Sequence, residues 1–79
     1  MSKKATLAVA QKSSDGLGAR MRAQRRRLSM TLQQLSAMSG VSVGYISQLE
    51  RANATPTLGT LTQIAGALEV DTDYFVRTP

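Results

Sequence analysis

Few side chains in this sequence could carry out chemistry, and most of them are basic. The chain of 79 residues has no cysteine and no histidine, so it lacks Ser–His and Cys–His nucleophile pairs and the usual ligands of a zinc site. Its five acidic residues show no carboxylate pair at a catalytic spacing; they are Asp15, Glu50, Glu69, Asp71 and Asp73. We therefore expect no enzymatic activity, no metal and no cofactor.

The basic residues are concentrated in the first third of the chain. Residues 1–27 contain eight of the ten Lys and Arg residues and one acid, a net charge of +7, whereas residues 28–79 have a net charge of −2. This asymmetry predicts that one surface binds a polyanion. No apolar run approaches the roughly 18 residues of a membrane span, and Leu7–Ala10 is too short for a signal-peptide core. We expect a cytoplasmic protein that does not bind membranes.

The elements that must position these charges are predicted to be helices. Hydrophobic residues make up 42% of the chain, and nearly all are aliphatic because only three residues are aromatic. This composition favours helices over sheets, and the length allows one modest core. We expect an all-α protein, with a flexible basic N-terminal arm over residues 1–15 and one folded domain over residues 16–77. Lys3, Lys4 and Lys12 lie in the arm.

Apolar spacing and capping residues predict the first two helices of this domain. Leu17, Met21 and Leu28 mark one face of a helix that ends close to Ser29. A second, shorter helix begins after Thr31, an N-cap whose capping-box partner is Gln34, and it ends at Gly40, where a left-handed turn needs a residue without a Cβ.

The remaining helices follow the same rules. Ser42 caps a third helix, and Thr57 caps a fourth. Val41, Ile46 and Leu49 anchor the third helix, and the fourth has the clearest periodicity, with a predicted buried stripe at Leu58, Leu61, Ile64, Ala65 and Leu68. A final short turn is expected to bury Phe75. Together these segments predict a five-helix domain.

The second and third helices form the pattern that indicates a function. Two short helices joined by a few residues that include Gly, with the second helix polar on its outer face, are typical of a helix-turn-helix. The residues that follow this pattern read TLQQLSAMSGVSVGYISQLERANATPTLGTLTQIAGALEV. This segment resembles the DNA-binding family of phage Cro and repressor proteins and their bacterial XRE-like relatives, over about residues 17–75. Ser29 and Ala52 stand where that family often has glycine.

The resemblance implies a lambda-repressor-like fold and a set of DNA-contacting residues. In the family, the recognition helix enters the major groove of double-stranded DNA, and the implied base-reading positions are Ser42, Val43, Gly44 and Gln48. Gln48 is the strongest candidate, because a Gln amide can pair with adenine. The implied phosphate-binding positions, which orient the protein without reading sequence, are Thr31, Gln33, Tyr45, Ser47, Arg51 and Asn53.

Some of these side chains have a structural alternative. The resemblance implies that Arg25 and Glu50 form a partly buried ion pair rather than contact DNA. Tyr45 could pack between helices or bind phosphate, and Thr31 could act only as a cap. Arg26 and Arg27 fit a solvated face as well as a binding surface.

A regulator of this family is expected to work as a dimer on a two-fold operator. One small domain buries little surface, so specific affinity needs two half-sites. The expected dimer contacts, which form a weak interface that DNA reinforces, are Val70, Tyr74, Phe75 and Val76. The alternative is an antitoxin-like protein-interaction module that masks a partner protein, with DNA binding secondary.

Overall fold

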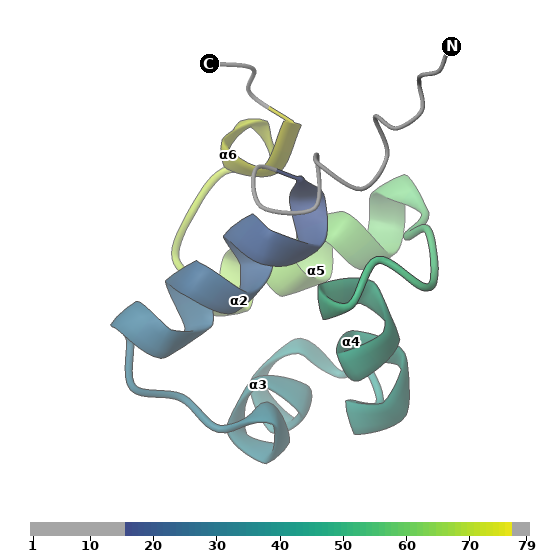
Figure 1. The fold of residues 1–79 in the computed structure, drawn as a ribbon. Helices are drawn as coiled ribbons and strands as arrows, with labels where there is room; N and C mark the ends of the chain where they lie inside the picture. Colours follow the sequence, from purple (N-terminus) through teal and green to yellow (C-terminus); the bar gives the residue numbers. More distant parts are fainter. Residues whose placement is uncertain (1–15, 77–79) are drawn as a thin grey trace, which may run out of the picture.

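The computed structural model describes residues 16–76, except for the side chain of Val76, and consists of five helices without a strand in that range (Figure 1). The helices are α2 (Leu17–Arg27), α3 (Leu32–Ser39), α4 (Val43–Glu50), α5 (Leu58–Ala67) and α6 (Asp73–Val76). The predicted all-α, five-helix fold is confirmed. The expected arm over residues 1–15, with Lys3, Lys4 and Lys12, lies outside the described residues. No helix within residues 16–76 is long and apolar enough to span a membrane.

The predicted N-caps are present at three helices. Thr31 and Gln34 form the capping box before α3: the Gln34 amide donates to Thr31 Oγ1 (3.0 Å), and the Thr31 amide donates to Gln34 Oε1 (2.8 Å). Ser42 Oγ accepts from the Tyr45 amide before α4, and Thr57 Oγ1 accepts from the Thr60 amide before α5. Each cap satisfies one of the amides that a helix start leaves without a carbonyl.

Three helices end in the same left-handed turn without glycine. Ser29 (φ 57°), Ala52 (φ 63°) and Glu69 (φ 62°) follow the last residues of α2, α4 and α5. After α4, the Ala52 amide donates to the Leu49 carbonyl (3.1 Å) and the Asn53 amide to the Gln48 carbonyl (2.8 Å). This pair of bonds defines a Schellman motif, which usually places glycine at the left-handed position. Glycine occupies that conformation only at Gly40 (φ 78°), after α3.

The core lies where all five helices meet. α2 packs against α4 and α6, while α3 packs against α4 and α5. The side chains that are completely or almost completely buried are Met21, Leu35, Ile46, Leu49, Ile64 and Leu68. The buried Gln24 side chain donates to the Leu68 carbonyl (3.0 Å), which avoids an unpaired polar group in the core. Phe75 is buried as predicted, but Leu58 is 75% exposed, so the predicted stripe of α5 begins at Leu61.

Gly18 allows α2 to approach the end of α4 closely. A Cβ at this position would overlap the Leu49 carbonyl oxygen and would lie 2.8 Å from that of Glu50. Both neighbours are backbone atoms, so they cannot move aside as a flexible side chain could. Gly18 is therefore required where the first helix crosses the end of α4.

We predict that Gly18→Ala destabilises the domain by about 2–3 kcal/mol, because the added methyl group pushes α2 away from α4. The matched control is Gly66→Ala in α5, where a Cβ would meet nothing within 4 Å. That change should stabilise the fold by about 0.5–1 kcal/mol through helix propensity. Chemical denaturation of both variants measures the difference, and equal free energies of unfolding would contradict the close approach.

Candidate nucleic-acid interface

The turn between α3 and α4 is fixed at both of its ends. Gly40 supplies the left-handed residue, and the Val41 amide donates to Ser39 Oγ (3.2 Å) within the turn. Val41 is buried, and Ile46 and Leu49 bury one side of α4 in the core. A helix of eight residues is too short to be stable alone. Packing of the side that carries Ile46 and Leu49 therefore sets the orientation of α4, and the opposite side of the helix faces solvent.

The four predicted base-reading residues lie at the start and on the outer side of α4. Ser42, Gly44 and Gln48 are exposed, while Val43 is half-buried. A Cβ at Gly44 would meet nothing within 4 Å, so the backbone of the first turn is open to close approach. Gln48 is the longest side chain among the four and carries an amide that both donates and accepts hydrogen bonds.

The predicted phosphate-binding residues border this face. Thr31 and Gln33 are exposed at the start of α3, and Asn53 is exposed in the loop after α4. Arg51 is exposed and donates to Ser47 Oγ one turn earlier (2.7 Å), so these two side chains lie together on the outer side of α4.

Tyr45 has the packing role, which is one of the two alternatives considered for it, and phosphate binding by Tyr45 stays a prediction. Its half-buried ring packs against the core, and its hydroxyl donates to the Thr55 carbonyl (3.1 Å). The phenolic oxygen retains its capacity to accept a hydrogen bond. Tyr45 thus ties α4 to the loop that leads into α5.

An ion pair holds the end of α4 against α2. Arg25 donates from Nε to Glu50 Oε2 (2.8 Å) and from Nη2 to Glu50 Oε1 (3.0 Å), a bidentate arrangement. The side chains of Arg25 and Glu50 are 11% and 6% exposed. Arg25 also donates to the Met30 carbonyl (2.9 Å). Hydrogen bonding to Glu50 raises the pKa of Arg25, so Arg25 keeps its positive charge beside the Glu50 carboxylate.

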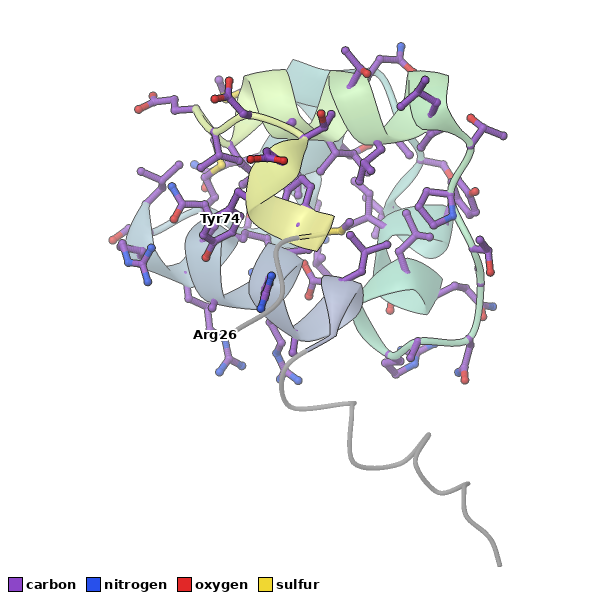
Figure 2. The ribbon with its side chains drawn as sticks, turned by 90° about the horizontal axis from the view of Figure 1, so that it is seen from above. Arg26 and Tyr74 are labelled. Carbon is purple, nitrogen blue, oxygen red and sulfur yellow. The ribbon has the colours of Figure 1, made fainter. Side chains whose placement is uncertain are left out.

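The residues expected to form the dimer contact differ in their exposure to solvent. Val70 and Tyr74 are half-buried, whereas Phe75 is 3% exposed and contacts the Tyr74 ring edge-on at 5.4 Å. Phe75 therefore belongs to the core of one chain, and its assignment as a dimer contact is corrected. Figure 2 shows Tyr74 on α6 beside α2, where Arg20 donates to the Tyr74 carbonyl (3.2 Å). The side chain of Val76 lies outside the described part of the chain.

One feature was missed by the sequence analysis. A hollow of about 840 Å³ lies between α2 and the end of α4, and it is lined by Arg22 and Arg26 on one wall and by Arg51 on the other. The signal in the sequence was the spacing of four between Arg22 and Arg26, beside the small residues Ala19 and Ala23.

The geometry of α3, the turn and α4 agrees with comparisons to known proteins. A family model described as helix-turn-helix matches residues 21–75. The chain belongs to the XRE-type helix-turn-helix family. The P22 c2 repressor, solved in complex with synthetic operator 9T in the presence of Tl⁺, superposes with a TM-score of 0.74 and 35% sequence identity. The superposition covers 78% of this chain and 94% of the repressor chain.

Curated relatives in the helix-turn-helix family are longer than this chain. An uncharacterised HTH-type transcriptional regulator of Sinorhizobium fredii (strain NBRC 101917 / NGR234) is 41% identical over 51 residues, which are 65% of this chain and 26% of the relative. Another from Mycobacterium tuberculosis (strain ATCC 25618 / H37Rv) is 41% identical over 61 residues, which are 76% of this chain and 44% of the relative. The chain therefore spans less than half the length of these regulators.

We predict that Glu50→Gln destabilises this helix-turn-helix domain by about 3 kcal/mol, because the change leaves the Arg25 charge buried without a counter-ion. The double variant Arg25→Met, Glu50→Leu should lose less than the sum of the losses of Arg25→Met alone and Glu50→Leu alone, since it removes both charges together. Thermal or chemical unfolding of the four proteins in this cycle gives the coupling energy. Additive losses would show that the two side chains act independently.

Proposed function

We propose that this chain is a sequence-specific double-stranded DNA-binding transcriptional regulator, most simply a repressor, that reads the major groove with α4. The observation that carries the proposal is the two-sided character of α4. Ile46 and Leu49 fix its inner side in the core, while Gly44 and Gln48 lie open on its outer side. Family membership and the likeness to an operator-bound repressor support this assignment.

The composition of the outer side favours A·T base pairs. An amide such as that of Gln48 can bond to both N6 and N7 of adenine in the major groove. The Val43 side chain offers apolar contact, which suits the methyl group of thymine. Gly44 adds no side chain, and this lets the helix start approach the base edges closely. We infer a half-site in which adenine and thymine occupy the positions beneath Gln48 and Val43.

The border of the face is suited to the DNA backbone. Free amides at the start of α3, near Thr31 and Gln33, favour a phosphate through the helix dipole. Arg51 and Asn53 supply side-chain donors at the opposite end of α4. In this proposal, the basic arm over residues 1–15 adds further phosphate contacts.

Replacing Gln48 tests the base-reading role. We predict that Gln48→Ala costs about 1–3 kcal/mol on the preferred site and relaxes the preference at one base pair in each half-site. Arg51→Ala should instead weaken binding to all sequences similarly and lower the salt slope by about one. Binding to a duplex selected from a random pool, compared with a random duplex, measures both. An equal loss on both duplexes for Gln48→Ala would refute base reading.

We propose that two copies bind a two-fold operator. The self-complementary patch consists of Val70 and Tyr74, with Val76 as a further member. So small a patch should give a weak free dimer, because a standard interface buries about 1,200–2,000 Å². DNA would reinforce it by holding two half-sites together.

Charge in the patch tests this assembly. We predict that Tyr74→Asp abolishes cooperative binding to a symmetric site while half-site binding stays nearly unchanged, because two aspartates would face each other across the axis. Quantitative footprinting gives both affinities, and the unfolding temperature verifies the fold. Gln63→Asp, at an exposed position on α5, is the charge-matched control. Non-cooperative binding by the unaltered chain would overturn the two-fold proposal.

An apolar surface beside α3 supports the alternative function, that of a protein-interaction module. A hollow of about 290 Å³ beside α3 is lined in part by Leu28, Met30 and Met38, and the Met38 side chain is 61% exposed. Such an apolar surface suits a protein partner. A module that mainly masks another protein would show no steep salt dependence on duplex DNA, whereas the regulator proposed here must.

A further inference from the structure

The five arginines of α2 divide into two groups. The side chains of three form hydrogen bonds: Arg20 donates to the Tyr74 carbonyl and Arg25 to Glu50, both outside α2, and Arg27 donates to the Gln24 side chain within α2. Arg22 and Arg26 are exposed, and the side chain of neither forms a hydrogen bond or ion pair with another residue of the described part of the chain. Figure 2 shows Arg26 extending from α2 away from Tyr74 and α6.

Arg22 and Arg26 share one hollow with Arg51, which comes from the end of α4. The lining between them is small and apolar, with Ala19 and Ala23 on the α2 side. Glu50 is the one acid in the lining, and its negative charge is compensated by the ion pair with Arg25. Three arginines therefore line the hollow, and its one acid is already paired, so the hollow would attract an anion.

The hollow continues the proposed DNA-binding face. Its second wall is formed by Arg51, Ala52, Ala54 and Thr55, residues of the same loop as Asn53. α4 has eight residues and a length of about 12 Å, close to the width of the major groove of about 12 Å. When the first turn of α4 meets base edges, its far end reaches the backbone that borders the groove.

We propose that Arg22 and Arg26, together with Arg51, bind the phosphodiester backbone that borders the major groove occupied by α4. This inference rests on the proposed function and adds α2 to an interface that otherwise consists of α3, α4 and the loop after α4. Residues four apart on a helix lie about 6 Å apart along its axis, and one DNA strand carries a charge about every 3.4 Å of axis. Arg22 and Arg26 can therefore pair with different phosphates of one strand, each through its planar fork.

The test uses the whole chain with Arg22→Ala, Arg26→Ala, singly and together, on a duplex selected by the unaltered chain and on a random duplex. Each neutralised phosphate contributes about 0.9 to the slope of log affinity against log salt, so the double variant should lose about two from that slope on both duplexes. The matched control is Arg27→Ala, which removes the same charge from the same helix outside the hollow. Arg27→Ala should change the salt slope by less than about 0.5, which is about half of the contribution of one phosphate.

Phosphate ethylation interference locates the contacts. The unaltered chain should be blocked by ethylation at phosphates that no longer matter to the double variant, while those that depend on Arg51 remain. Arg22→Lys, Arg26→Lys should restore most of the slope, because the charge is kept. Both substituted residues are exposed, and unchanged unfolding temperatures would verify the fold.

Three results would overturn the inference. The first is a double variant with an unchanged salt slope and interference pattern. The second is a slope loss for each single variant, Arg22→Ala or Arg26→Ala, that equals the loss for Arg27→Ala, which would reflect net charge alone. The third is that an acidic peptide, tested as a short polyglutamate, binds the hollow without competing with the selected duplex.

In each case Gln48→Ala still tests base reading independently. If the unaltered chain bound no duplex in a salt-dependent manner, the proposed function would fail as well.

Discussion

The contact between α2 and the end of α4 is the constraint on which the rest of this structure depends. α4 is too short to hold its own position, so its direction must come from neighbours. Ile46 and Leu49 set which side faces inward, but apolar packing alone permits a short helix to rotate or slide. The bidentate Arg25–Glu50 pair adds a directional restraint, and Gly18 lets α2 come close enough to apply it. The buried pair thus serves to fix orientation more than to add stability.

The same pair determines the electrostatics of the exposed surface. An unpaired Glu50 would place a negative charge beside Arg51 and the loop that follows, where the proposed phosphate contacts lie. Arg25 removes that charge from inside the fold, so neighbouring arginines are free to act on a polyanion. In the proposed interface, the Glu50 carboxylate would thus have two effects. Its ion pair positions α4, and the same ion pair would keep its negative charge from repelling DNA phosphates.

Local rules predicted much of the fold, because the deciding groups lie within a few residues of each other. The capping box of Thr31 and Gln34, the left-handed Gly40 and the cap at Ser42 are examples. Failures arose where tertiary packing decides. Leu58 matches the helical period, but it lies in the first turn of α5 beyond the edge of the core. Phe75 was assigned two roles, and burial in one chain excludes the other. The pairing of Arg25 with Glu50 came from resemblance, since spacing alone cannot join residues on separate helices.

The helix ends show how the chain stiffens the loop after α4 without glycine. Ala52 adopts a left-handed conformation that costs a residue with a Cβ roughly 1–2 kcal/mol, yet the Schellman bonds of Ala52 and Asn53 hold it there. Glycine would relieve the strain, but it would also give the unfolded chain more freedom and the loop more alternative conformations. Arg51 and Asn53 flank this residue on either side. In the proposed interface, a loop that begins from a fixed turn would keep these donors in place before DNA arrives, so less conformational entropy would be lost on binding.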